Sequence, residues 1–180
     1  MTDWTVTISG SGYRLIAPHY RCGCLVGKTG FIAGEDKREG DMATPVGAWP
    51  LRHLYYRPDR ITPPETGLPI IPLDESMGWC DDPADPAYNM PVTRPYAGRH
   101  ERLWRADGLY DLIVVLGHND SPPIPLRGSA VFLHLREDDT RHTAGCVAVT
   151  RQDLLVLLRA ADTNTTLRIG GSDSQPDDST

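Results

Sequence analysis

Apolar and polar side chains alternate in short runs at the start of the chain. Residues 4–8, 13–17 and 22–26 carry apolar side chains at about every second position, and Gly10-Ser11-Gly12 and Ala17-Pro18-His19 separate the runs. A period of two is typical of half-buried strands, and breaks of this composition are typical of turns. We therefore predict antiparallel strands in this region.

A further extended segment covers residues 44–51. Its two prolines, Pro45 and Pro50, lack the N–H that the interior of a strand ladder requires. They predict an edge strand or a bulged strand.

The strongest strand signals lie at residues 110–116 and 129–135. Both runs are almost continuously apolar, which is typical of central strands covered on both faces. Residues 165–169 predict one last strand.

One helix is expected, beginning at Thr150. Asp153 follows Thr150 by three residues, as in a capping box, and leucines then form an apolar stripe through Ala161. The predicted fold class is mainly β with one clear helix (α+β).

A proline-rich stretch without periodicity begins at Arg57. A loop of this length in a compact domain is either functional or disordered, and its embedded Trp79 and Tyr88 favour an ordered insertion at about residues 57–105. We expect a single domain over residues 1–170 and a flexible polar tail over residues 171–180.

Charge and hydropathy exclude several classes of function. The net charge of −6 gives no support for nucleic-acid binding, and no apolar stretch is long enough to span a membrane. The first residues lack the pattern of a signal peptide, which favours a chain that is not exported. Four cysteines are too few for a disulfide scaffold; Cys22 and Cys24 fit small strand residues better than zinc ligands.

Candidate chemistry centres on a histidine and a cysteine that a short loop connects. His134 ends the apolar run, and Cys146 follows Thr143-Ala144-Gly145 on an expected tight turn. A thiol becomes an effective nucleophile when a positioned imidazole removes its proton, and backbone N–H groups on such a turn can form an oxyanion hole. A buried structural cysteine is the alternative interpretation.

These residues resemble the signature of the L,D-transpeptidase (YkuD) family. His134 and Thr143-x-Gly145-Cys146-Val147 match its histidine, spacer and Ser/Thr-x-Gly-Cys motif. Upstream, Gly27-Lys28-x-Gly30 and then Lys37-Arg38-Glu39-Gly40-Asp41-Met42-Ala43-Thr44-Pro45-x-Gly47 are similar to an early family element. The resemblance spans about residues 22 to 170.

The resemblance implies an L,D-transpeptidase-like β-sandwich catalytic domain that acts on the peptide stems of peptidoglycan. In it, Cys146 would be the nucleophile and His134 the base. The backbone carbonyl of Leu135 would orient the imidazole, and the N–H groups of Gly145 and Cys146 would bind the oxyanion.

Three features depart from the family pattern. Ala144 and Ala148 stand where many relatives carry histidine and either arginine or asparagine, and the spacer between His134 and Cys146 is short. These departures leave the preferred substrate open.

Substrate binding is predicted for residues near this motif. Arginine suits bidentate binding of stem carboxylates, and an aromatic side chain can form a wall of the cleft, although a solvated surface or core packing is the alternative for each. The candidates are Thr143, Ala144, His118, Asn119, Arg127, Arg136, Arg141 and Trp79, with the insertion as a gate for the acceptor.

Three functions remain open. The leading one is an L,D-transpeptidase that forms a thioester on the diaminopimelate of a donor stem, releases D-Ala and makes a crosslink. The second is an L,D-carboxypeptidase, and the third is a non-catalytic peptidoglycan-binding module. The expected partners are donor and acceptor stem peptides. We expect no cofactor, no metal, no nucleic acid and no membrane span, and we expect a monomer. Family resemblance implies the periplasm or cell envelope, and the missing signal peptide makes the cytoplasm the alternative.

Overall fold

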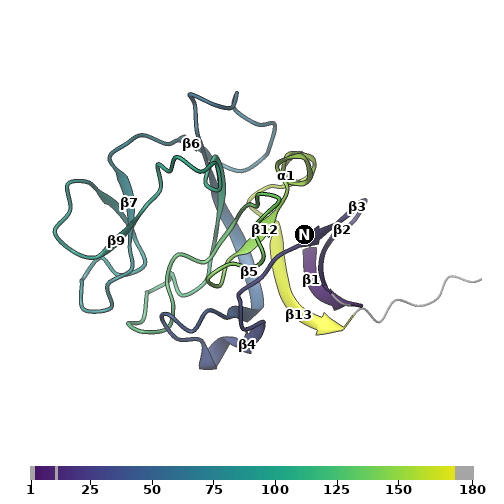
Figure 1. The fold of residues 1–180 in the computed structure, drawn as a ribbon, viewed down its shortest axis with the longest axis horizontal. Coiled ribbons are helices and arrows are strands. Elements are labelled where there is room, and N and C mark those ends of the chain that lie inside the picture. Colours follow the sequence, from purple (N-terminus) through teal and green to yellow (C-terminus); the bar gives the residue numbers. More distant parts are fainter. Residues whose placement is uncertain (1–2, 11, 173–180) are drawn as a thin grey trace, which may run out of the picture.

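A computed structural model describes residues 3–10 and 12–172 of the chain. Within these residues the fold is mainly β, with one α-helix, α1 (Arg151–Leu158), and one short 3-10 helix, η1 (Gly34–Asp36). The predicted fold class is therefore confirmed. Figure 1 shows a small sheet with β7 (Met77–Cys80) and β9 (His100–Arg102) at one end of the molecule, and β1 (Asp3–Ser9), β2 (Gly12–Ala17) and β3 (Tyr20–Cys24) at the other.

Ten of the strands form one continuous sheet. Along it, neighbouring strands are β12 (Val147–Val149), β11 (Phe132–Leu135), β10 (Leu112–Leu116), β5 (Thr44–Tyr56), β13 (Thr166–Ser172), β1 (Asp3–Ser9), β2 (Gly12–Ala17) and β3 (Tyr20–Cys24), while β4 (Phe31–Ala33) and β6 (Ile70–Pro72) pair with β5 beside this path.

The two ends of this sheet meet. Leu25, immediately after β3, exchanges two backbone hydrogen bonds of 2.8 and 2.9 Å with Ala148 of β12. The contact continues as the Thr143 N–H donates to the Val26 carbonyl at 2.9 Å. The sheet is thus rolled into a nearly closed barrel, and the layers expected of a sandwich belong to one curved sheet.

β5 is a central strand, so the edge position predicted from its prolines is wrong, whereas the alternative, a bulged strand, agrees with the register. Residues 47–50 of β5 pair with β13 and residues 51–56 pair with β10, and the three steps from Leu51 to Leu54 lie opposite the two steps from Val114 to Leu116 of β10. Pro50 is tolerated because the strand changes partner at this point, so the missing N–H interrupts no continuous ladder.

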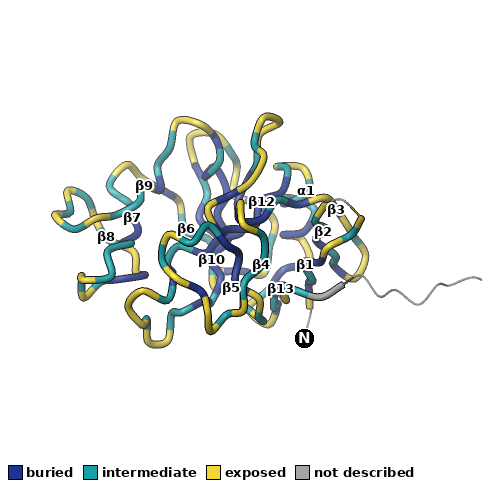
Figure 2. The backbone as a smooth tube through the Cα atoms, turned by 60° about the horizontal axis from the view of Figure 1, so that its bottom comes forward, coloured by how far each residue is buried: buried dark blue, intermediate teal, exposed yellow. Residues whose placement is uncertain are grey.

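β10 and β11 separate two hydrophobic cores. Leu112 and Val114 belong to the larger core, which the first strands and α1 share, whereas Ile113 and Phe132 belong to a smaller core together with Cys146. Every residue of both strands is buried. The prediction of central strands covered on both faces is confirmed, and Figure 2 shows this buried centre with exposed loops around it.

The stretch over residues 57–105 packs against the smaller core. It contains a three-stranded sheet in which β7 (Met77–Cys80) lies between β8 (Pro91–Thr93) and β9 (His100–Arg102). Trp79 and Tyr88 are 5 % and 3 % exposed, so this stretch is a packed unit. The division of the chain into domain and tail stays a prediction.

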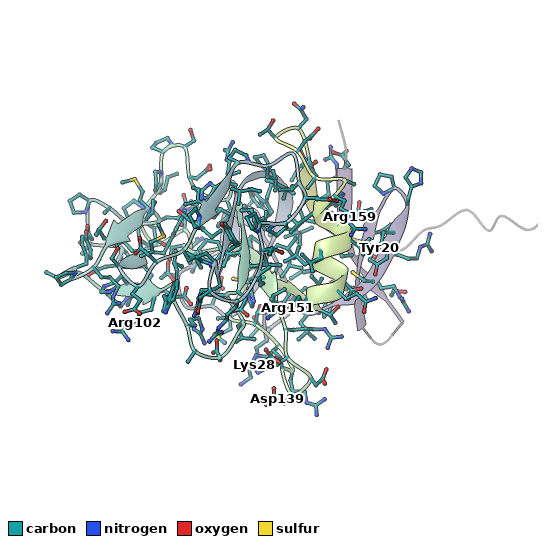
Figure 3. The ribbon with its side chains drawn as sticks, turned by 90° about the horizontal axis from the view of Figure 1, so that it is seen from above. Tyr20, Lys28, Arg102, Asp139, Arg151 and Arg159 are labelled. Atoms are coloured by element: carbon teal, nitrogen blue, oxygen red, sulfur yellow. The ribbon has the colours of Figure 1, made fainter. Side chains whose placement is uncertain are left out.

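The helix begins as its sequence predicts. Thr150 is the N-cap and its hydroxyl accepts a hydrogen bond from the Asp153 N–H at 3.1 Å. Leu154, Leu157 and Leu158 are buried, and the helix ends at Leu158, three residues before the predicted end. Figure 3 shows Tyr20 of β3 beside α1; its hydroxyl donates to Asp153 at 2.8 Å.

The chain ends are simpler. β13 extends three residues beyond the predicted strand end, to Ser172, and residues 173–180 of the predicted tail lie outside the described residues.

All four cysteines are free and buried. Within the described ranges, no helix is long and apolar enough to cross a membrane, and no group of three or more His, Cys, Asp or Glu side chains is placed to hold a metal ion.

Candidate active site

Cys146 lies at the end of a tight turn that leads into β12. The Thr143 hydroxyl accepts a hydrogen bond from the Gly145 N–H at 3.1 Å and donates one to the Cys146 carbonyl at 2.6 Å. Gly145 has φ +139°, and a Cβ there would lie 2.9 Å from the Ala43 carbonyl oxygen. The sequence Thr-x-Gly-Cys specifies this turn because a hydroxyl closes it and only glycine fits its third position.

The thiol of Cys146 is almost fully enclosed. The residue is 8 % exposed. Its Sγ donates to the Ala130 carbonyl at 3.2 Å and accepts from the Phe132 N–H at 3.4 Å. Burial, reinforced by the negative charge of Glu101, raises the pKa of this thiol to about 12. The resting thiol is therefore neutral and needs a base to become a nucleophile.

His134 projects from β11 toward the same cavity. Its Nδ1 lies 2.7 Å from the carbonyl oxygen of Leu135, the carbonyl that the resemblance names. The Tyr110 ring packs edge-on against the imidazole, with ring centres 5.2 Å apart. Burial lowers the pKa of His134 to about 4. The imidazole is therefore neutral at physiological pH, and if its Nδ1 carries the proton, the Nε2 can accept one.

The upstream motif forms the support beneath the nucleophile turn. The Thr44 hydroxyl accepts from the Gly27 N–H at 2.8 Å and lies 3.4 Å from the Cys146 carbonyl oxygen, to which it donates. Asp41 binds the Lys37 ammonium and accepts from the Ala43 N–H at 2.9 Å. Two sequence motifs about a hundred residues apart thus build one local structure.

A cavity of about 550 Å³ opens in front of Cys146 and His134. Such a volume is within the range of small-ligand sites. Residues from the upstream motif, the insertion, the segments before β10 and β11, β11 itself, the loop after it and the nucleophile turn line it: Lys37, Glu39, Gly40, Met42, Asp81, Glu101, Arg105, Leu109, Tyr110, Ser129, Ala130, Val131, His134, Thr140, His142, Thr143, Ala144, Gly145 and Cys146.

Tyrosine hydroxyls hold two carboxylates in this cavity. The Tyr110 hydroxyl donates to Glu101 at 2.7 Å, and the Tyr88 hydroxyl donates to Glu39 at 2.5 Å. Burial raises the pKa of the Glu101 carboxyl. Arg105 is also near Glu101, at 3.8 Å, but bonds Asp107 more closely, at 2.5 Å.

Thr143 and Ala144 line the cavity, and their contact with substrate stays a prediction. The loop after β10 lies elsewhere. His118 is 4 % exposed, and its Nε2 lies 3.1 Å from the Arg127 carbonyl oxygen. The Asn119 amide donates to the Gly128 carbonyl at 2.9 Å and so closes this loop. His118, Asn119 and Arg127 lie outside the cavity lining.

Three further candidates also lie outside the lining. Burial raises the pKa of Cys22 to about 12 and the positive charge of Arg136 partly offsets this rise, which places Arg136 near β3. Arg141 is exposed. Trp79 packs edge-on against Phe132, with ring centres 5.1 Å apart. Substrate contact by these six residues stays a prediction that the cavity does not support.

Asn89 connects the insertion to the backbone beside the thiol. This buried residue accepts hydrogen bonds from the Trp79 indole and from the Ala130 N–H, both at 3.0 Å. Its amide donates to the carbonyls of His118 and Asn119 at 3.1 and 2.7 Å. Ala130 has φ +51°, and its carbonyl is the one that faces Cys146. The insertion therefore fixes a strained backbone position at the nucleophile.

Several cavity residues were not predicted as site residues. Lys37 and Glu39 belong to the upstream motif, so the motif itself is the signal that could have found them. Glu101 and Tyr110 have no local signal, because β9 meets the cavity only through tertiary packing. His142, two residues before Ala144, also lines the cavity.

Ala148, the second alanine that departs from the family pattern, is fully enclosed. Ala148 is 0 % exposed and pairs with Leu25 on one side and with His134 on the other. A longer side chain would have no room there unless the sheet closure changed.

The comparison with protein families decides the family. The sequence pattern of the L,D-transpeptidase catalytic domain, YkuD, matches residues 5–169, which is nearly the whole chain. The chain belongs to this family.

Solved structures similar to this YkuD-family chain include two enzymes of Mycobacterium tuberculosis. L,D-transpeptidase 1 shares 8 % sequence identity at a TM-score of 0.43, with 94 % of this chain and 62 % of that chain covered. L,D-transpeptidase 3, in complex with a faropenem-derived adduct, shares 12 % sequence identity at a TM-score of 0.44, with 94 % of this chain and 60 % of that chain covered. This chain thus spans about three fifths of their length. No curated protein matches it.

Proposed function

We propose that the protein is a cysteine-dependent L,D-transpeptidase that crosslinks peptidoglycan stem peptides. One observation carries the proposal: Cys146, on its glycine turn, and His134, held at Nδ1 by the Leu135 carbonyl, line the same cavity. The arrangement supplies a thiol, a base with an oriented ring and room for a peptide in front of both.

In the proposed acylation, His134 Nε2 removes the thiol proton as Sγ attacks the carbonyl of the diaminopimelate residue in a donor tetrapeptide. A C–S bond forms and the C–N bond to D-Ala breaks. His134 then gives its proton to the leaving amine. A general base is needed because both groups are neutral at rest, as the lowered pKa of His134 and the raised pKa of Cys146 indicate.

The tetrahedral intermediate needs a donor for its oxyanion, and we propose the Cys146 N–H for this role. The Gly145 N–H, expected from the sequence to share it, donates to the Thr143 hydroxyl instead. We therefore assign Gly145 and Thr143 to positioning of the turn, and Cys146 and His134 to the chemistry.

In the second half of the proposed reaction, an amine of a neighbouring stem attacks the thioester and forms the crosslink. Attack by water would give the tripeptide product of a carboxypeptidase. Since the family acts on peptidoglycan, we place the protein in the cell envelope.

The test is incubation with purified disaccharide-tetrapeptide, followed by tandem mass spectrometry of the products. Wild-type protein should release D-Ala and form a crosslinked dimer, and Cys146→Ala should do neither. Cys22→Ala, which removes a buried thiol of β3 outside the cavity, is the matched control and should keep turnover. Formation of tripeptide alone would support the carboxypeptidase function. Absence of any product would support a non-catalytic binding module.

A further inference from the structure

We propose that Glu101 is the residue that takes the first proton from the acceptor amine and so favours crosslinking over hydrolysis. This inference rests on the proposed transpeptidase function and adds to it a residue that acts on the acceptor, whose amine is a cation before it reacts.

Proton balance in the second half-reaction requires such a group. An aliphatic amine arrives as R–NH3+ and cannot attack until it loses a proton. Glu101 accepts this proton, and the neutral nitrogen then attacks the thioester carbon. As the C–N bond forms and the C–S bond breaks, His134 takes the second proton from nitrogen and returns it to Sγ. Glu101 releases the first proton to solvent, while the D-Ala amine freed in the first half-reaction takes one up, so the complete turnover is proton-neutral.

Glu101 is placed for this step by two different elements. It lies on β9, at the register position opposite Trp79 of β7, and it lines the cavity that contains Cys146 and His134. Tyr110, next to β10, donates to its Oε1 at 2.7 Å, and the same Tyr110 ring packs against His134. One tyrosine therefore orients both the carboxylate and the imidazole.

The carboxylate keeps capacity for a cationic ligand. Its closest basic neighbour, Arg105, lies 3.8 Å away. Arg105 donates two hydrogen bonds to Asp107 instead, from Nε at 3.0 Å and from Nη2 at 2.5 Å. The Tyr110 bond uses one oxygen, so Oε2 is available to an ammonium group. Burial raises the pKa of this carboxyl, which makes it a better proton acceptor than an ordinary glutamate.

Glu39, the other carboxylate with a tyrosine partner, is less suited to the step. Its Oε2 accepts two hydrogen bonds, from Tyr88 at 2.5 Å and from Ser129 at 2.7 Å. The charge of Glu101, and not that of Glu39, is among the causes that raise the pKa of the Cys146 thiol. The electrostatic influence of Glu101 therefore reaches the reacting sulfur.

The experiment compares two nucleophiles on the acyl-enzyme formed from disaccharide-tetrapeptide. Methylamine is a cation at neutral pH and must lose a proton, whereas hydroxylamine is already uncharged. In Glu101→Gln the amide keeps an oxygen for the Tyr110 hydroxyl. Methylamide formation relative to tripeptide should fall at least about tenfold, while hydroxamate formation relative to tripeptide should stay near wild type.

The charge control is Glu65→Gln, since Glu65 is exposed and lies 3.7 Å from Arg159 on the helix side of the molecule. It should leave both products unchanged. Equal loss of methylamide and hydroxamate in Glu101→Gln would overturn the proposal, because it would indicate a structural role. No loss of methylamide, an equal loss in Glu39→Gln, or no methylamide from the wild type would overturn it as well. Absence of D-Ala release from the wild type would instead contradict the proposed function.

Discussion

At the scale of single residues, the site keeps its nucleophile and its base uncharged. His134 is 6 % exposed, and burial lowers its pKa to about 4, while burial raises the pKa of the Cys146 thiol to about 12. A preformed thiolate–imidazolium pair is therefore disfavoured, and proton transfer accompanies attack.

The pH profile of acylation should reflect this low histidine pKa. Because the base must be neutral, the single-turnover rate of D-Ala release should hold down to about pH 5 and fall as the pH drops through about 4. Rapid-quench measurements across this range would check it. An acidic limb near 6.5, the ordinary value for histidine, would contradict the assignment.

His134→Ala should slow acylation by about 10²- to 10⁴-fold, the usual contribution of a general base. The matched control is His118→Ala, because His118 is equally buried but lies outside the cavity lining. Both variants would be compared by D-Ala release at a temperature where circular dichroism shows them folded. A larger loss in the His118 variant would transfer the role of base to that residue.

At the scale of elements, the insertion contributes to the site and is tied firmly to the sheet. Asn89 makes four hydrogen bonds that join β7, the Ala130 backbone and the loop after β10. The sequence suggested that this insertion is a gate. The bonded contacts favour a fixed wall that sets the width of the cavity, although its effect on the acceptor stays a prediction.

Asn89→Ala should lower the free energy of unfolding by about 2–4 kcal/mol, since it leaves several buried polar groups unpaired. It should also slow acylation, because Ala130 would lose the bond that holds its carbonyl toward the thiol. Thermal denaturation and D-Ala release would measure the two effects. Asn164→Ala, at an exposed loop position, is the control and should change neither; an unaffected Asn89 variant would refute the role of this residue.

At the scale of the whole molecule, sheet closure places reactive groups at a buried position. Cys146 immediately precedes β12, and β12 pairs with β11 and with the segment after β3. The site is thus coupled to the closure of the barrel, and ionisation of its buried groups is coupled to stability.

Acid should destabilise the fold partly through His134. Its pKa is about 4 when folded and near 6.5 when unfolded, so between these values the unfolded chain binds more protons. Stability is lost as the pH falls from about 6.5 to 4, by on the order of 3 kcal/mol from this group. Urea unfolding at several pH values would show it as a shallower dependence in His134→Gln than in wild type. Parallel curves for the two proteins would refute the coupling.

The sequence by itself determined the local features. The alternation at residues 4–8 and 13–17, the continuous apolar runs of β10 and β11, and the Thr150 cap each depend on neighbouring residues, so the pattern predicts them. The same holds for the Thr-x-Gly-Cys turn, because its hydroxyl and its glycine lie within four residues.

Only the tertiary structure decided which residues form the walls of the cavity. Glu101 and Tyr110 line the same cavity as Cys146 only because tertiary packing brings β9 and the segment before β10 to it, and no short-range period encodes this packing. For the same reason, two residues predicted to bind substrate have other partners: Arg127 donates to the Glu35 carbonyl and the Trp79 indole donates to Asn89. β5 is central despite its prolines because it changes partner at Pro50, from β13 to β10. Chemistry at the nucleophile is thus a local property, whereas the choice of acceptor depends on the packing of distant strands.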